Sequence, residues 1–417
     1  MLEPVLEKKP VVYVTRDIER ALGLPLNTKG YYIISNFTPF VKSISGRQNN
    51  VLLIKEARLL DTYELLNHPQ TKDFLSKITA PNILVFKNTK AIENICENNH
   101  WHLINPKSEL ANLVEEKISQ VKWLGQLKKF LPPHEVKTLK QITWPKFARH
   151  GNKLLPFILQ FNRAHTGSGT YLIQTEEELN DLKTKFPDRL ARVTEYIAGP
   201  MFTNNNVVWG KEVLVGNINY QITGLRPFTL NTFATIGNDW ALPHKLLTPQ
   251  KIKQYQKMAN TIGEHLAKKG WQGLFGIDVI LNPKNNRLYL IEINARQPAS
   301  TTYESMLQDE EITKKNVSLL TTFAAHILSL LKEKNMQQKV AAISNGAQII
   351  QKVIKKMPSA KGIFNKLTEA NLKYFTYTNT KNESDWLRIQ STTGLFSNHN
   401  KLNSLGKKIQ TILNKSL

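Results

Sequence analysis

Two carboxylates, an amide and a guanidinium occupy positions that a single hairpin would bring together. Asp278 and Glu292 are equidistant from Asn285, so a turn centred there places them opposite each other, and Asn294 shares the face of Glu292. Like charges directly opposite in a ribbon are destabilising, and a hard cation such as Mg²⁺, which takes oxygen ligands and retains substrate phosphates, resolves that conflict. Arg296 follows at the same parity and can meet an anion held by the metal. The competing interpretation is an exposed hairpin whose polar face meets water.

The hairpin is predicted from two apolar stretches, Gly276–Leu281 and Arg287–Asn294, on either side of the turn-forming residues Asn282–Asn286. Residues of the opposite parity are apolar and are expected to form core: Ile277, Val279, Ile291 and Ile293.

A glycine-bearing loop is a second candidate for phosphate chemistry. The strand predicted at Pro156–Phe161 opens into Thr166–Thr170, which reads Thr-Gly-Ser-Gly-Thr. Glycines let the backbone approach phosphate oxygens, and the hydroxyl groups add donors. The pattern matches neither the P-loop nor the dinucleotide fingerprint, so a hairpin loop without a ligand is the competing interpretation.

The elements that position these segments alternate between strands and helices, which is typical of an α/β protein with a parallel sheet at its N-terminus. Strands are expected at Val11–Thr15, Tyr31–Ser35, Val51–Ile54, Asn82–Phe86, Arg192–Ile197 and Lys211–Gly224. Helices are expected at Thr62–Ile78, Thr89–Asn98, 111–130, Glu176–Lys185, Thr248–Lys269 and Ser404–Leu413. Ala347–Ile354 fits a strand or a helix, and Thr203–Asn206, with three consecutive asparagines, is expected in a turn.

Composition limits the class of protein. The 417 residues carry a net charge of +23, but 12 arginines among 56 basic residues leave lysine with most of that charge. Arginine is the residue of bidentate phosphate recognition, so a dispersed lysine-rich surface is favoured over nucleic-acid binding. One cysteine, Cys96, excludes an internal disulfide framework. The absence of a signal-peptide core and of a long apolar stretch predicts a cytoplasmic protein without membrane contact.

Taken in order, the segments resemble the ATP-grasp superfamily. Phe157–Ile173 is similar to the phosphate-covering loop of the family, Val193–Gly199 to the hinge that holds adenine, and Gly273–Asp278 with Leu290–Arg296 to its metal-binding hairpin. The Arg in the last segment resembles the branch with biotin carboxylase, carbamoyl-phosphate synthetase and amino-acid ligases. The implied fold has two α+β subdomains gripping ATP, after an α/β parallel-sheet domain. The expected boundaries are 1–110 for that first domain, 111–198 for the small subdomain, 199–331 for the large one, and 332–417 for a basic C-terminal extension.

The resemblance implies an ATP-dependent ligase that activates a small carboxylate as an acyl phosphate for attack by an amine or a thiol. Its partners would be small-molecule carboxylates and amines, and its cofactors ATP and Mg²⁺, with Mn²⁺ as an alternative. By position, Asp278, Glu292 and Asn294 would hold the metal, and Arg296 would be catalytic. The nucleotide would meet the remaining matched residues: Lys117 in a helix, Gln160, Gly167, Ser168, Gly169, Thr170, Glu195, Tyr196 and Ile197.

Two positions depart from the family pattern. Gln160 stands where a lysine usually contacts phosphate, and Met201 stands where an acidic residue often binds ribose. Either Lys153, Arg163 or His165 supplies the missing charge, or catalysis is degraded. The departures keep open a second hypothesis, a degenerate ATP-binding sensor or scaffold without turnover, beside the less favoured basic nucleic-acid-binding protein. No sequence pattern indicates an oligomeric state.

Overall fold

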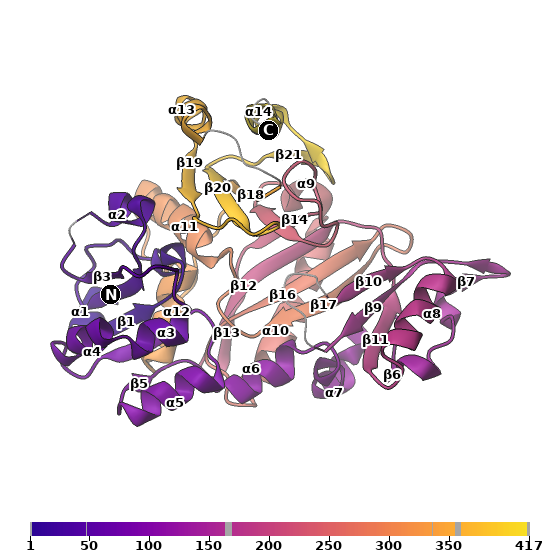
Figure 1. Cartoon of the computed structure of the whole chain (residues 1–417), viewed down its shortest axis with the longest axis horizontal. Helices are drawn as coiled ribbons and strands as arrows, with labels where there is room; N and C mark the ends of the chain where they lie inside the picture. Colours follow the sequence, from indigo (N-terminus) through magenta and orange to yellow (C-terminus); the bar gives the residue numbers. More distant parts are fainter. Residues whose placement is uncertain (1, 47, 163–168, 336, 355–359, 415–417) are drawn as a thin grey trace.

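A computed structural model describes residues 2–46, 48–162, 169–335, 337–354 and 360–414 (Figure 1). Within these residues the fold is carried by a five-stranded, a four-stranded and a nine-stranded sheet. No described helix is both long enough and apolar enough to cross a membrane.

The five-stranded sheet is parallel, in the order β3-β2-β1-β4-β5, and confirms the α/β unit expected at the N-terminus. Its strands are β1 (Val11–Val14), β2 (Tyr31–Asn36), β3 (Val51–Ile54), β4 (Asn82–Val85) and β5 (His102–Leu103). Its helices are α1 (Leu2–Lys8), η1 (Ile18–Ala21, a 3-10 helix), α2 (Pro39–Ser45), α3 (Thr62–Asn67), α4 (Pro69–Ser76) and α5 (Lys90–Asn98). Both sheet faces are buried. Val12 and Val14 pack with Leu65 of α3, whereas Val11 and Tyr13 pack on α12 (Thr322–Leu330), which comes from much later in the chain.

Two helices expected as continuous are interrupted. The segment 62–78 is divided between α3 and α4 because Pro69 restricts His68 to an extended conformation. The segment 111–130 is divided into α6 (Ser108–Glu115), α7 (Ser119–Leu124) and the 3-10 helix η2 (Gly125–Phe130). Lys117 lies between α6 and α7, so the expectation that it lies in a helix is wrong. There the chain leaves the helical path, and the Ile118 amide donates to Asn162 Oδ1 at 3.0 Å.

The four-stranded sheet is antiparallel, in the order β10-β9-β11-β6. Its strands are β6 (His134–Thr138), β9 (Phe157–Phe161), β10 (Thr170–Ile173) and β11 (Leu190–Glu195). Around it lie η3 (Leu139–Gln141), η4 (Lys146–Ala148), the small hairpin β7 (Arg149–His150) and β8 (Lys153–Leu154), and α8 (Glu176–Lys185). Phe157, Leu159 and Phe161 pack in one apolar cluster with α8 residues, which leaves Gln160 on the other face of the sheet.

The nine-stranded sheet runs in the order β17-β16-β12-β14-β15-β18-β20-β19, with β13 paired to β12. Its strands are β12 (Met201–Trp209), β13 (Glu212–Leu214), β14 (Ile218–Thr223), β15 (Thr235–Asp239), β16 (Gly273–Asn282), β17 (Arg287–Asn294), β18 (Ala347–Lys352), β19 (Lys373–Thr376) and β20 (Asp385–Ser391). The remaining elements are α9 (Pro243–Leu246), α10 (Pro249–Ala267), α11 (Thr301–Lys315), α13 (Ala360–Glu369), β21 (Phe396–Asn398), β22 (Lys401–Leu402) and α14 (Ser404–Asn414). The last part of the chain thus adds three strands to this sheet, and Ala347–Ile354 is mainly a strand.

The asparagine run lies in the middle of β12 and not in a turn. Asn204, Asn205 and Asn206 are fully buried. Asn204 and Asn206 exchange hydrogen bonds of 2.6 and 2.8 Å, while Asn205 donates to Glu304 on α11 and accepts from Ser300. Turn propensity fails here because each amide finds the partner that burial requires.

Asp239 ties the C-terminal segment to the large sheet. Its carboxylate is fully buried and accepts four backbone N–H groups. Two come from Ala241 and Leu242 at 2.8 and 2.9 Å, and two from Leu395 and Phe396 at 2.7 and 3.0 Å. One side chain therefore joins the end of β15 to the start of β21.

Asp239→Ala is expected to lower the free energy of unfolding by more than about 3 kcal/mol, because four buried donors lose their acceptor. Asp239→Asn, which keeps one acceptor oxygen, should lose less. Urea unfolding followed by circular dichroism measures both, with the exposed Asp181→Ala on α8 as a control that should stay within about 0.5 kcal/mol. A loss below about 1 kcal/mol for Asp239→Ala would contradict this role.

Candidate functional site

The β16–β17 hairpin brings its polar residues together as expected, and the expected register holds over residues 276–278 and 292–294. Asp278 pairs directly with Glu292, and Gly276 pairs with Asn294, so all three polar side chains share one face. Beyond this pair a β-bulge shifts the register, and Val279 pairs with Leu290. A turn centred on Asn285 would pair Val279 with Ile291, so the expected centre holds from the Gly276–Asn294 pair to the Asp278–Glu292 pair and fails from Val279 to the turn.

The bulge moves Ile291 out of the core face. Ile291 was expected to pack beside Ile277 and Ile293, but it is half-buried and contacts a separate apolar cluster formed by Ile197, Ile280 and Tyr289. An extra residue in one strand reverses the alternation from that point onward. The Ile291 carbonyl is turned toward the small sheet, where it accepts from Arg192 Nη2 at 3.2 Å.

The two opposed carboxylates have different electrostatic surroundings. Burial, together with Glu292, raises the pKa of Asp278 to about 6. Burial acts in the same direction on Glu292, but the nearby cations, Lys117 first, lower its pKa below the usual range. Lys117 Nζ lies 2.6 Å from Glu292 Oε2 in an ion pair. Lys117 therefore contacts the hairpin itself, and the break between α6 and α7 allows it to do so.

Arg296 is clamped beside the hairpin by a residue that the sequence does not single out. Its Nη2 donates to Asn294 Oδ1 at 2.7 Å, and its Nη1 donates to Glu115. Lys87 donates to the other oxygen of Glu115 at 2.6 Å. Glu115 thus fixes the plane of the Arg296 guanidinium while its own charge is shared with Lys87. Only the tertiary contact between α6 and β17 identifies it.

Gln160 is buried on β9, directly opposite Arg192 on β11. Its Oε1 accepts from Arg192 Nε and Nη2 at 3.2 and 2.6 Å, and its Nε2 donates to Thr170 Oγ1 at 3.2 Å. Arg192 was expected only as a strand residue. Lys153, one of the cations proposed to replace the missing lysine, is exposed on β8.

The glycine loop is described only at its end. Thr170 begins β10, and Gly169 O accepts from the Phe161 amide at 3.1 Å, which closes the β9–β10 hairpin. Gly167 and Ser168 lie outside the described residues, as do Arg163 and His165.

The hinge joins the two antiparallel sheets. Glu195 ends β11, Tyr196 and Ile197 follow, and Met201 begins β12. A Cβ on Gly199 would lie 2.1 Å from the Leu281 carbonyl oxygen, so only glycine fits this crossing. Met201 packs against the apolar cluster of Ile197, Ile280 and Tyr289. The hinge thus presents an apolar wall beside the polar hairpin.

The donor set of the hairpin suits a hard cation. No group of three or more His, Cys, Asp or Glu side chains in the described part of the chain lies close enough to hold a metal. The hairpin offers two carboxylates and one amide oxygen, and Mg²⁺ commonly uses one or two carboxylates and completes its shell with water and phosphate. Glu292 already pairs with Lys117 and Asn294 with Arg296. Because two of the three oxygen donors already have cationic partners, the hairpin fits a metal ion that makes few bonds to the protein.

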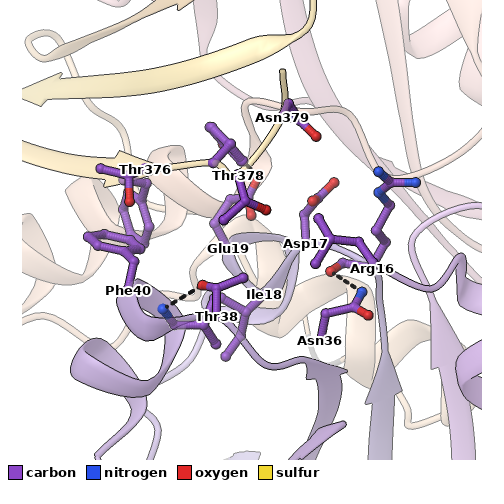
Figure 2. Close-up of a pocket in the computed structure, with 14 residues that line it drawn as sticks. Arg16, Asp17, Ile18, Glu19, Asn36, Thr38, Phe40, Thr376, Thr378 and Asn379 are labelled. Atoms are coloured by element: carbon purple, nitrogen blue, oxygen red, sulfur yellow. Dashed lines mark hydrogen bonds between the residues drawn. The ribbon is translucent and has the colours of Figure 1, made fainter. Parts of the chain in front are cut away.

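A pocket lies where the N-terminal sheet meets the end of β19 (Figure 2). Arg16, Asp17 and Glu19 line it from the segment that follows β1, and Tyr377 lines it from the segment that follows β19. Tyr377 donates to Glu19 at 2.8 Å. Burial, followed by the charge of Glu19, raises the pKa of Asp17 to about 7. The same loop is tied to the hairpin, because Gln297 Nε2, next to Arg296, donates to the Arg20 carbonyl at 2.9 Å.

Comparison with known proteins agrees with this architecture. Residues 114–300 match the model of the ATP-grasp domain family. No curated protein matches the chain. Carboxyaminoimidazole ribonucleotide synthase from Aspergillus clavatus, solved with ATP, is 15% identical over 98% of both chains, with a TM-score of 0.64.

Two further solved structures share the fold. The L-amino acid ligase from Bacillus licheniformis is 12% identical over 98% of this chain and 97% of its own, with a TM-score of 0.63. The biotin carboxylase domain of 2-oxoglutarate carboxylase from Hydrogenobacter thermophilus is 14% identical over 93% of this chain and 86% of its own, with a TM-score of 0.60. The chain therefore contains an ATP-grasp domain, at residues 114–300.

Proposed function

We propose that the chain is an ATP-dependent ligase that activates a small carboxylate as an acyl phosphate, which an amine or a thiol then attacks. The observation that carries this proposal is the partly buried group of charged side chains at the junction of the two antiparallel sheets. There Asp278 and Glu292 lie opposite each other beside Lys117 and Arg296. Catalysis of phosphoryl transfer depends mainly on positioning the reactants and neutralising the charge of the phosphate oxygens. Rigidly held carboxylates and cations provide both.

The nucleotide is proposed to lie between the small and the large sheet. Its adenine would meet the hinge backbone at Glu195, Tyr196 and Ile197, next to the apolar cluster. Its phosphates would lie under the glycine loop formed by Gly167, Ser168, Gly169 and Thr170, near Lys117 and Gln160. The burial of the hinge cluster and the closeness of Lys117 to the hairpin support this placement.

Asp278, Glu292 and Asn294 are proposed to hold Mg²⁺, with Mn²⁺ as an alternative, and the ion would neutralise charge on the phosphate oxygens. The protein's own part is to keep these oxygens on one rigid face. The direct pairing of Asp278 with Glu292 does so without any loop. Lys117, already beside Glu292, offers its remaining N–H groups to phosphate.

The proposed reaction has two displacements. A carboxylate oxygen attacks the γ-phosphorus and ADP leaves; a nitrogen or sulfur nucleophile then attacks the acyl carbon and phosphate leaves. Arg296 is the proposed catalytic residue, because Glu115 and Asn294 hold its guanidinium in one orientation. A preoriented cation stabilises developing charge without reorganising during the step.

The acidic pocket of Figure 2 is the site that we propose for an amine substrate. Glu19, and Asp17 once it has lost its proton, would meet an ammonium group, and Asn36 and Thr38 add polar groups to the lining. The hydrogen bond from Gln297 to the Arg20 carbonyl connects this pocket to the residue that follows Arg296. The L-amino acid ligase among the structural neighbours supports a substrate with an amino group.

A nucleotide-binding sensor or scaffold without turnover is the second candidate function. Gln160 in place of a lysine and Met201 in the apolar hinge cluster favour it. Release of ADP with pools of amino acids and carboxylic acids separates the two. Turnover supports the ligase, whereas tight binding of Mg-ATP without release of ADP from any pool supports the sensor.

Arg296→Ala is expected to slow ADP release about 10²-fold while the Kd of Mg-ATP changes less than threefold, because the guanidinium acts on charge that develops during transfer. Lys87 remains to pair with Glu115 in this variant. The rate of ADP release is measured in reactions stopped at set times, and the Kd of Mg-ATP is measured by calorimetric titration. The control is Arg58→Ala, an exposed arginine of the N-terminal domain. Unchanged turnover in Arg296→Ala would remove this residue from the mechanism.

Asp17→Asn is expected to raise the melting temperature at pH 8 and to leave it unchanged at pH 4. The folded pKa of about 7 exceeds the unfolded value near 3.9, so the bound proton stabilises the fold fully below about pH 4 and this contribution is lost as pH rises through 7. Besides burial, Glu19 and Asp385 raise this pKa, and Arg20 and Arg16 lower it.

Thermal unfolding at both pH values tests this, with the exposed Asp73→Asn on α4 as the matched control. A gain of the same size at pH 4 and pH 8 would show that Asp17 is not protonated by its surroundings.

A further inference from the structure

Arg192 is a buried guanidinium whose hydrogen-bond partners among the described residues are all neutral. It is 2% exposed. Its three donor nitrogens meet the side-chain oxygens of Gln160 and Gln120 and the Ile291 carbonyl, at 2.6 to 3.3 Å. No described carboxylate lies within ion-pair distance of it.

A buried charge without a counter-ion is costly for a fold. Burial accordingly lowers the pKa of Arg192 to about 10, so it remains a cation near neutral pH. Glu292 opposes this shift, but Glu292 is already paired with Lys117. The positive charge of Arg192 therefore lacks a counter-ion, and a bound anion would provide one.

Arg192 also fixes which way the Gln160 amide points. A guanidinium can only donate hydrogen bonds, so the oxygen of Gln160 must face it and the NH₂ group must face away. That NH₂ group donates to Thr170 Oγ1 at 3.2 Å, at the residue where the glycine loop enters β10. The N–H donors of Gln160 thus point toward Thr170, at the end of the glycine loop, and its oxygen accepts hydrogen bonds from the Arg192 cation.

We propose that Arg192 is the positioning residue for a phosphate anion, acting through the oriented amide of Gln160. The proposal rests on the proposed binding of ATP between the two sheets and assigns the phosphate chain as the anion. The amide donates directly to a phosphate oxygen, and the guanidinium behind it supplies the positive charge. A donor backed by a charge binds an anion more strongly than a neutral amide does.

The arrangement predicts that a lysine at position 160 acts differently in two backgrounds. In the wild-type chain, Gln160→Lys places a second cation against Arg192 and removes the acceptor of two of its hydrogen bonds. In the Arg192→Met background, the same lysine replaces the lost charge. The effect of Gln160→Lys on ATP affinity should therefore change sign, weakening binding in the first background and strengthening it in the second.

The experiment measures the Kd of Mg-ATP and of adenosine by calorimetry for wild type, Gln160→Lys, Arg192→Met and the double variant. Arg192→Met should weaken Mg-ATP at least tenfold and leave adenosine within twofold, since adenosine has no phosphate. Arg192→Lys, which keeps the charge, should recover part of the loss. Arg189→Met is the matched control, because Arg189 is exposed just before the same strand.

Three results would overturn the proposal. One is a folded Arg192→Met with unchanged affinity for Mg-ATP; another is an equal loss for ATP and adenosine, which marks a structural role; the third is no change of sign for Gln160→Lys. If Arg192→Met does not fold, Gln160→Leu, which removes the amide, must show the same selective loss of ATP. A wild-type chain that binds no Mg-ATP would instead overturn the proposed function.

Discussion

The opposition of two carboxylates across one buried strand pair is the constraint around which the centre of this molecule is organised. Asp278 and Glu292 cannot move apart, because the ladder of β16 and β17 fixes them. Their repulsion is offset by Lys117, which reaches the hairpin from a gap between two helices. Arg296, held by Glu115, adds a second cation. The two carboxylates and these two cations therefore balance one another at the site where we propose that a metal and a phosphate chain bind.

The hinge gives this cluster its geometry relative to the small sheet. Gly199 passes so close to the Leu281 carbonyl that the connection between the sheets is held against the turn end of the hairpin. Arg192 adds a hydrogen bond from β11 to the bulged carbonyl of Ile291. The two sheets are therefore linked at both ends of the region where a nucleotide is proposed to bind. Separation of the two sheets in that region would break the Arg192 hydrogen bond or bend the hinge.

Strand parity was sufficient to predict the shared face of Asp278, Glu292 and Asn294, because side chains alternate with a period of two. It could not predict the bulge at Ile291, which depends on the pairing of both strands. Arg192 and Glu115 were missed for a related reason, since their partners lie on other elements and no local pattern marks them. The asparagines of β12 show the converse. Their propensity favours a turn, but tertiary hydrogen bonds override it.

The N-terminal sheet depends on a helix that the ribosome makes much later. Phe323, Ile327 and Leu330 of α12 cover one face of the sheet, packing against Val11 and Tyr13. While the first domain is being synthesised, that face has no cover, although its local strands and helices are complete. Such a sheet would stay exposed to association with other chains until about 220 more residues had been added, a number set by the distance from β5 to α12. The order of elements along the chain therefore makes chaperone protection during translation more important for the first domain than for the last.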